Sequence, residues 1–237
     1  SFGDEFAVTP NIDELSKEAT IFLNNHNQLA ICAASRVSFL TGLRPDNTKV
    51  WDLKTKMRDV NPDVLTLPEH FKNNGYETIG IGKIYDPRAV DSGRDRRSWS
   101  VPFITQNQLK FSDGYSFPSG GFYQGKENRE IRSKFRKEGI EKGVSNLNKY
   151  ESDRFKPPYE NADVPDGAYM DGAIANRAVE LIDQMDSSKP FFLAVGFLRP
   201  HLPFNAPTKY WNMYNEDEIQ LAEFRTKSKN PVDIAYK

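Results

Sequence analysis

The sequence predicts an α/β fold, with a mostly parallel central sheet flanked by helices, and three observations support this prediction. Two short apolar runs, residues 76–81 and 191–197, have the length and composition of buried strands. Each run follows a helical pattern and a polar turn, an order that is typical of layered α/β domains. The polar residues Lys83 and His201 follow the two runs. Because the carboxyl ends of parallel strands border the ligand crevice, we expect both side chains to lie at one site.

Helices are predicted where a cap or a proline precedes a periodic apolar pattern. They cover about residues 9–19, 32–41, 67–73, 127–142 and 170–185. Gly42 should end the second of these helices and Asn74-Gly75 the third, because glycine is favoured just past a helix end. A further short strand is predicted at residues 21–23. Residues 43–47 should break regular structure.

Composition excludes several classes of protein. The 237 residues include 32 basic and 33 acidic side chains, so the net charge of -1 gives no global field toward nucleic acid or a membrane surface. The single cysteine excludes an intrachain disulfide and any zinc site built from several cysteines. No apolar stretch reaches the length of a membrane span, and residues 1–5 are not a signal peptide. The length suits a single domain over residues 1–237.

Periodicity weakens in the middle of the chain, where residues 88–162 are interpreted as a variable insertion. A long, weakly patterned segment in a compact domain more often serves function or specificity than core packing. It contains a charged run at residues 94–97. Such a run is usually a solvated face, and alternatively it helps to bind a polyanion.

The single cysteine, Cys32, lies at the start of its predicted helix. The free N–H groups and the positive end of the helix dipole stabilise an anion there, either the thiolate or the oxygens of a ligand. Arg36, one turn along, adds a planar cation that suits a tetrahedral oxyanion. Plain structural alternatives stay open: Cys32 could be a small buried hydrophobe and Arg36 the partner of a surface acid. Lys83 could be a solvated strand end, and His201 a rigid turn between prolines.

Several motifs occur together in an order that resembles the type I, formylglycine-dependent sulfatases of the alkaline phosphatase superfamily. The first is Cys32-Ala33-Ala34-Ser35-Arg36 with its helix to Gly42, followed by Arg44-Pro45-Asp46. Others are Leu67-Pro68, Asn74-Gly75-Tyr76, Gly82-Lys83 and Val164-Pro165-Asp166-Gly167. After residues 191–197, the segment Pro200-His201-Leu202-Pro203-Phe204 resembles the iduronate 2-sulfatase branch. The resemblance covers residues 8–87 and 163–214.

The resemblance implies a mechanism and a role for each candidate residue. In this family the motif cysteine is oxidised to formylglycine, whose hydrated aldehyde attacks the sulfur of a sulfate ester and later expels sulfate. Cys32 would become that nucleophile and would also be a ligand of a divalent cation, Ca²⁺ or Mg²⁺, in the complete enzyme. Arg36 would polarise its hydroxyls, Lys83 would bind a sulfate oxygen, and His201 would contact the leaving group. Asp86, near the position where relatives carry a histidine, would also bind the substrate.

The resemblance also implies partners and a location. The substrate would be a sulfated carbohydrate, and the maturation partner a formylglycine-generating enzyme or a radical enzyme. The protein would be periplasmic or secreted. Two other functions stay open: a hydrolase of phosphate or phosphonate esters with the same fold, and a catalytically silent protein that binds sulfated glycans.

Three departures from the family pattern bear on what this chain should do alone. Ala34 replaces the usual proline of the Cys-x-Pro-x-Arg motif, and Tyr85 and Asp86 occupy the region of a family histidine. The aspartates that hold the family's cation have no counterpart after a strand here, so residues 1–237 are expected to be an internal part of a sulfatase domain. Hard cations need several oxygen ligands, and the chain by itself should therefore not hydrolyse sulfate esters.

Overall fold

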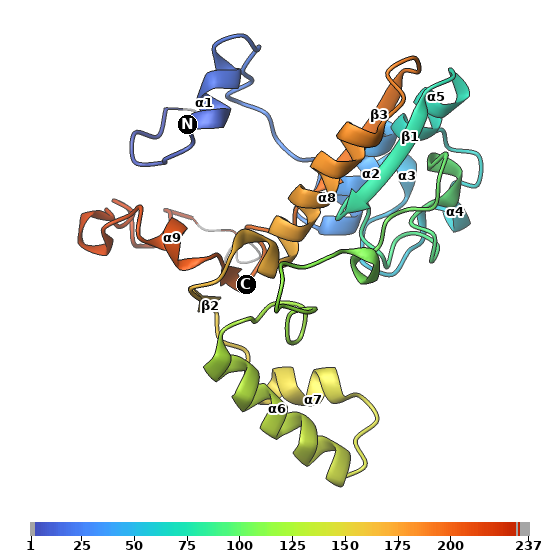
Figure 1. Cartoon of the computed structure of the whole chain (residues 1–237). Coiled ribbons are helices and arrows are strands. Elements are labelled where there is room, and N and C mark those ends of the chain that lie inside the picture. The colour runs from blue at the N-terminus through green and yellow to red at the C-terminus, as the bar shows by residue number, and fades with distance from the viewer. Residues whose placement is uncertain (1–2, 231, 233–237) are drawn as a thin grey trace.

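The computed structural model describes residues 3–230 and 232, and at its centre lies a pair of parallel strands (Figure 1). Strand β1 (Glu77–Gly82) pairs with β3 (Phe191–Gly196), and the register runs from Glu77 opposite Phe191 to Gly82 opposite Gly196. Helix α8 (Met170–Gln184) precedes β3 in the chain and lies against the pair. The two strands therefore end together, at the edge where ligands bind in open α/β sheets.

Most of the other elements in the described residues are short, and the exception is the 16-residue helix α6 (Lys126–Glu141). The remaining α-helices of these residues are α1 (Pro10–Ser16), α2 (Cys32–Thr41), α3 (Pro45–Thr48), α4 (Met57–Val60), α5 (Leu67–Asn73), α7 (Leu147–Arg154) and α9 (Thr208–Trp211). Short 3₁₀ turns are η1 (Arg96–Ser98), η2 (Gln106–Gln108), η3 (Asp166–Ala168) and η4 (Glu216–Glu218). Strands β2 (Tyr159–Glu160) and β4 (Phe204–Asn205) form a second parallel pair. Over the described part of the chain, no helix combines the length and the apolar character that crossing a bilayer requires.

The two faces of the β1–β3 pair enter two separate apolar clusters. Ile81 and Val195 pack in the cluster that contains Ile174 of α8. Ala194 packs against the cluster that contains Val37 of α2. Because successive side chains of a strand point to opposite faces, α8 covers one face of the pair and α2 belongs to the layer on the other. The predicted α/β fold, with a parallel sheet flanked by helices, is confirmed.

Elements with strong local signals form close to where the sequence predicts them. Helix α2 ends at Gly42, whose φ is 69°. The Thr66 hydroxyl caps α5 by accepting a hydrogen bond from the Glu69 N–H. The apolar runs become β1 and β3, and the predicted helices over 127–142 and 170–185 become α6 and α8.

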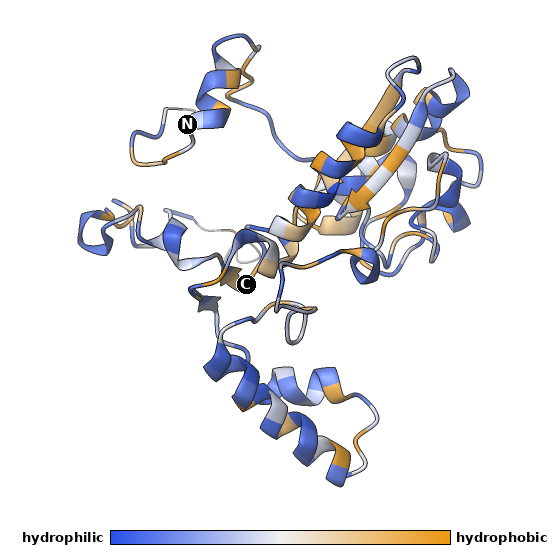
Figure 2. Cartoon of the chain, viewed as in Figure 1, coloured by the Kyte–Doolittle hydropathy of each residue, from blue (hydrophilic) through white to orange (hydrophobic). Residues whose placement is uncertain are grey.

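A helical hairpin from the middle of the chain projects away from the strand pair (Figure 1). Helices α6 and α7 pack against each other, and much of the α6 ribbon is hydrophilic (Figure 2). Arg132 of α6 and Glu151 of α7 form an ion pair at 2.9 Å with side chains only 1% and 3% exposed. Arg136 pairs with the second oxygen of Glu151 at 2.6 Å. The hairpin is therefore held together in part by a buried charge cluster.

Several local predictions are wrong. Residues 21–23 form no strand, and Phe22 is 75% exposed, because no neighbouring strand offers them ladder hydrogen bonds. Helix α1 ends at Ser16 rather than at about Ala19. In the segment expected to be irregular, Pro45 starts the single helical turn α3, since proline is well suited to the first position of a helix.

Two further expectations need correction at the tertiary level. The apolar run at β3 predicts a central strand, yet among the described residues its one strand neighbour is β1. The charged run at residues 94–97 is not simply a solvated face, because the Asp95 side chain is 0% exposed. Its carboxylate pairs with Arg58 inside the domain, and a buried charge requires such a partner.

Gly82→Ala should disrupt the end of β1. Gly82 has a φ of 79°, and a Cβ there would overlap the carbonyl oxygen of Gly196. We expect the variant to lose about 3 kcal/mol or more of unfolding free energy, because left-handed strain and a backbone clash combine. The control is Gly75→Ala, where φ is 84° and nothing lies within 4 Å of the added Cβ. That change should cost about 1–2 kcal/mol. Urea unfolding measures both variants, and equal losses would contradict the predicted clash.

Candidate active site

Helix α2 presents Cys32 at its first position. Ile31 before it is extended, and its carbonyl accepts the first helical hydrogen bond, from the Ser35 N–H at 2.9 Å. The N–H groups of the first turn have no partner within the helix. Cys32 is half-buried, whereas Ala33 and Ala34 are 0% exposed. A buried first turn therefore fixes the cysteine while its side chain stays partly accessible.

The end of β1 brings Lys83 to this cysteine. The Lys83 N–H donates to the Gly196 carbonyl at 2.7 Å and so extends the contact between β1 and β3. The Lys83 Nζ lies 3.9 Å from the Cys32 Sγ. A cation at this distance stabilises negative charge at position 32. The structure thus brings together two residues that the sequence predicts to be catalytic.

Arg36 ties α2 to the chain that leaves β1. Its guanidinium donates to the carbonyl oxygens of Lys83 and Ile84, the latter at 3.0 Å. Burial lowers the pKa of Arg36, and the nearby charges of Cys32 and Asp86 oppose that shift. Guanidinium groups stay protonated in proteins, so Arg36 adds a permanent positive charge beside Cys32. Arg36 also fixes the backbone at Lys83.

Asp86 and Arg88 form a two-pronged ion pair after Lys83. Arg88 Nε donates to Asp86 Oδ1 and Nη2 donates to Oδ2, both at 2.9 Å, and the Arg88 backbone N–H donates to Oδ1 at 3.1 Å. The Asp86 side chain is 1% exposed and that of Arg88 is 56% exposed. These hydrogen bonds hold the pKa of Asp86 below its usual value. The sequence analysis predicts no role for Arg88. The signal that could have indicated its position is Asp86, because an aspartate often accepts a hydrogen bond from the backbone N–H two residues later in a turn.

Three of these residues, Lys83, Asp86 and Arg88, line one pocket with a volume of about 270 Å³. The rest of the wall is largely apolar and includes Phe103, Leu109, Met170, Ile174 and Leu198. Ligand sites often combine apolar walls with a few oriented polar groups. The pocket therefore has the character of a site for a small anionic ligand or for part of a larger one.

His201 lies in the exposed turn that follows β3. The side chain is exposed, and its Nδ1 lies 2.6 Å from the carbonyl oxygen of Leu202. Its backbone N–H donates to the Leu198 carbonyl at 3.0 Å. In the part of the chain that the structure describes, no hydrogen bond joins His201 to Cys32 or Lys83. Its predicted contact with the leaving group stays a prediction.

Asp171 holds the segment that leads to His201. Its two carboxylate oxygens accept hydrogen bonds from the N–H groups of Leu198 and Arg199, each at 2.8 Å. The Arg199 guanidinium in turn donates to the carbonyl oxygens of His201 and Pro203. From the sequence, Asp171 would be interpreted only as an acidic residue that stabilises the first turn of a helix. Local patterns therefore do not reveal its contact with a segment 27 residues away.

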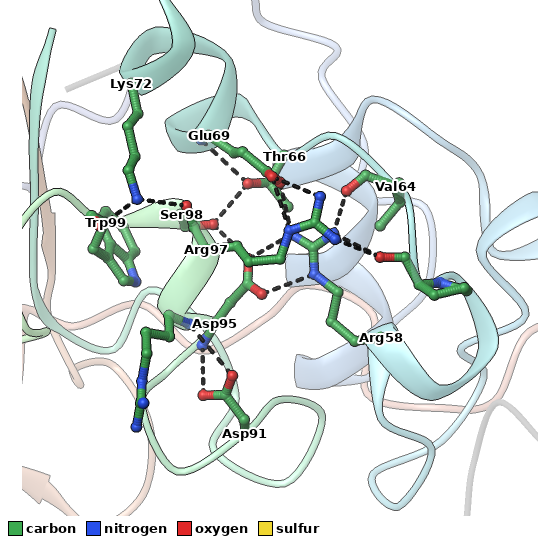
Figure 3. A network of polar contacts seen from close by, with 12 residues as sticks. Arg58, Val64, Thr66, Glu69, Lys72, Asp91, Asp95, Arg97, Ser98 and Trp99 are labelled. Atoms are coloured by element: carbon green, nitrogen blue, oxygen red, sulfur yellow. Dashed lines mark hydrogen bonds and ion pairs between the residues drawn. The ribbon is translucent and has the colours of Figure 1, made fainter.

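A buried polar network supports the chain after β1 from the side opposite to α8. Arg58 donates to both carboxylate oxygens of Asp95, at 2.9 and 3.0 Å (Figure 3). Ser98 also donates to Asp95, and its Oγ lies 3.1 Å from the Tyr85 hydroxyl. Burial raises the pKa of Tyr85, and the charge of Asp95 adds to the increase. The network thus anchors Tyr85, which lies in the chain between the candidate residues at positions 83 and 86.

The divalent cation implied by the sequence does not fit the residues described. Within residues 3–230 and 232, no group of three or more His, Cys, Asp or Glu side chains could hold a metal ion together. Ca²⁺ usually takes about six to eight oxygen ligands. The nearby carboxylate, Asp86, has both oxygens engaged by Arg88. The described site is therefore a set of cations around Cys32 and not a carboxylate shell.

The Asp86–Arg88 pair predicts an acid dependence of stability. Because the folded-state pKa of Asp86 lies below its usual value of 3.8, the pair stabilises the fold above that pH. The contribution is lost as pH falls through the folded-state pKa. We expect acid below about pH 4 to destabilise the wild type more than Asp86→Asn, which has no such proton to bind. Urea unfolding at several pH values measures this, with Asp153→Asn on α7 as the control. Equal acid sensitivity of Asp86→Asn and wild type would contradict the prediction.

The fold and this arrangement define an α/β protein in which Lys83 and Arg36 place positive charge near a cysteine at a helix start. A family model described as Sulfatase matches residues 1–230, and the chain belongs to this family. The chain is 34% identical to iduronate 2-sulfatase of Mus musculus, an alignment that covers 93% of this chain and 36% of that protein. It is 28% identical to a protein named Sulfatase from Formosa agariphila, with 94% and 40% covered. The chain thus spans less than half the length of these relatives.

A solved structure shows the same fold. The phosphonate monoester hydrolase of Agrobacterium radiobacter superposes with a TM-score of 0.52, covering 92% of this chain and 41% of that chain. At 20% sequence identity, this likeness concerns the fold alone. It agrees with a parallel sheet flanked by helices, and the predicted membership of the sulfatase family is confirmed by the family match.

Proposed function

We propose that the protein carrying this chain hydrolyses sulfate esters, with a formylglycine made from Cys32 as its nucleophile. The observation that carries the proposal is the cationic surrounding of Cys32, above all the Lys83 Nζ at 3.9 Å from its Sγ. Arg36, one turn further on α2, adds a second cation. Membership of the sulfatase family supports sulfate as the group that is transferred.

The proposed reaction forms and breaks a covalent intermediate. A maturation enzyme with its own two-electron oxidant converts the Cys32 side chain to an aldehyde, whose oxygen replaces the sulfur, and the sulfur leaves as hydrogen sulfide. The aldehyde then hydrates to a geminal diol. One hydroxyl attacks the sulfur while the ester alcohol leaves with a proton. The second hydroxyl then loses its proton, sulfate departs and the aldehyde re-forms. Lys83 and Arg36 stabilise negative charge on the oxygens in both steps, and His201 is proposed to contact the leaving alcohol.

The proposed substrate is a sulfated sugar of a polysaccharide. The mouse relative is named an iduronate 2-sulfatase, which supports a sugar as the alcohol part of the ester. A formylglycine-generating enzyme or a radical enzyme is the proposed maturation partner, and the proposed location is periplasmic or secreted. A cation, Ca²⁺ or Mg²⁺, belongs to the proposal for the whole protein, with the formylglycine made from Cys32 as one ligand and carboxylates other than those described above as the rest.

Two measurements test the function. Mass spectrometry of the Cys32 peptide from the native host should show a mass lower by about 18 Da, because one oxygen replaces one sulfur and two hydrogens. Unmodified cysteine would overturn the nucleophile and favour a silent glycan-binding protein. Turnover of sulfate and phosphate esters of one aryl alcohol should favour sulfate. Faster turnover of the phosphate ester would instead assign a phosphate ester hydrolase.

A further inference from the structure

The exposed half of the Asp86–Arg88 pair shares a pocket with Lys83, whose Nζ lies 3.9 Å from the Cys32 Sγ. Both residues follow Lys83 on the chain that leaves β1, and all three line the pocket of about 270 Å³. Lys83 therefore links the pocket that contains Arg88 to Cys32. The hydrogen bonds to Asp86 raise the pKa of Arg88, and the charge of Cys32 makes a smaller contribution in the same direction.

The geometry of the pair leaves part of the guanidinium free for a ligand. Arginine carries five N–H donors, and the two bonds to Asp86 use its Nε and one hydrogen of Nη2. Within the residues that the structure describes, Nη1 makes no hydrogen bond. The Arg88 side chain is 56% exposed, so these donors are accessible from solvent. A guanidinium that is anchored on one edge and free on another is well suited to a tetrahedral oxyanion.

The anchor itself is unsuited to contact with the substrate. The Asp86 side chain is 1% exposed, both of its oxygens accept hydrogen bonds from Arg88, and its negative charge would repel a sulfate ester. A buried carboxylate paired in this way restricts the rotamers of its arginine partner and thereby orients the free N–H groups. Asp86 is therefore a positioning residue.

We propose that Arg88, positioned by Asp86, binds an oxygen of the sulfuryl group that reacts at Cys32. The inference rests on the function proposed above. Arg88 then supplies a positive contact in the region where the family pattern has a histidine and this chain has Tyr85 and Asp86. Lys83, Arg36 and Arg88 would face the anion, and the Asp86 carboxylate would stay bound to Arg88.

The first test uses the Cys32 thiol as a probe of this field. The protein is produced without a maturation enzyme, and alkylation of Cys32 by anionic iodoacetate and by neutral iodoacetamide is followed by peptide mass spectrometry. The ratio of the two rates should fall about three- to tenfold in Arg88→Gln, because the anionic reagent loses an attractive charge. Arg88→Lys should keep most of the ratio. Arg177→Gln, which removes a paired arginine on α8, is the control and should leave it unchanged.

The second test uses the matured protein and a sulfate ester. Arg88→Gln should lower kcat/KM about 10- to 100-fold, the usual effect of losing a hydrogen bond to a charged group, and Arg88→Lys should restore part of it. Asp86→Asn should lower kcat/KM on its own but cause no further loss in the Arg88→Gln background. Additive losses would give Asp86 a separate contact and overturn its positioning role.

The two tests separate this inference from the proposed function. A protein that turns over sulfate esters equally well with and without Arg88, at an unchanged alkylation ratio, overturns the role of Arg88 and leaves the function intact. The turnover test uses the whole matured protein that carries this chain. If that protein has no sulfate turnover, but its alkylation ratio still falls in Arg88→Gln, the function is refuted and the anion contact is supported. The Arg88 variants decide the matter even where Asp86→Asn fails to fold, because Arg88 is largely exposed.

Discussion

Cys32→Ala should reduce sulfate ester turnover by at least about 10³-fold, because it removes the nucleophile and leaves only the cations that bind the substrate. Binding of the ester should persist, since Lys83 and Arg36 are retained. Steady-state turnover of an aryl sulfate, together with calorimetric binding of the same ester, measures the two effects separately.

The substitution is mild for the fold. Cys32 is only half-buried, and the next two residues of α2 are already alanines. The thermal midpoint should therefore stay close to that of the wild type, which excludes misfolding as the cause of lost turnover. Lys83→Met is the companion variant and should lower kcat/KM about 10²- to 10³-fold, because it removes stabilisation of the developing charge. Turnover within tenfold of wild type in Cys32→Ala would exclude Cys32 as the nucleophile.

Asp95→Ala should lower the free energy of unfolding by about 3–5 kcal/mol, because it removes the buried carboxylate that is the main partner of the partly buried Arg58. The Asp95 side chain is 0% exposed and that of Arg58 is 17% exposed. Burial alone lowers the pKa of Arg58, and the hydrogen bonds with Asp95 and Glu69 more than reverse this (Figure 3). Removal of one carboxylate therefore leaves a charge without adequate compensation.

A matched control exists in the same network. Arg97 pairs with Glu69 at 2.9 Å, but its side chain is 52% exposed. Arg97→Gln should cost no more than about 1 kcal/mol, as is usual for exposed ion pairs. Chemical denaturation of both variants gives the comparison. A similar small loss in Asp95→Ala would show that the network contributes little to stability.

The elements that the sequence predicts correctly are those with strong signals in one short stretch. Gly42 ends α2, Thr66 caps α5, and two apolar runs become β1 and β3. Caps and apolar patterns act within a few residues, so they can be recognised without knowing the fold. The strand predicted at residues 21–23 fails because a strand is stable only beside another strand, and that neighbour is not a local property.

Local sequence patterns were sufficient to predict the family, the α/β class and Cys32 as the centre of the candidate site. Which charges surround Cys32 depends on contacts between segments that are distant in the sequence. Lys83 approaches Cys32 from 51 positions away, and Asp95 finds Arg58 across 37. Asp86 is turned to Arg88 inside the domain, whereas His201 stays exposed. Motifs and helix caps are formed by residues that are close in the sequence. The partner of a buried charge, in contrast, depends on how distant segments pack in the whole domain.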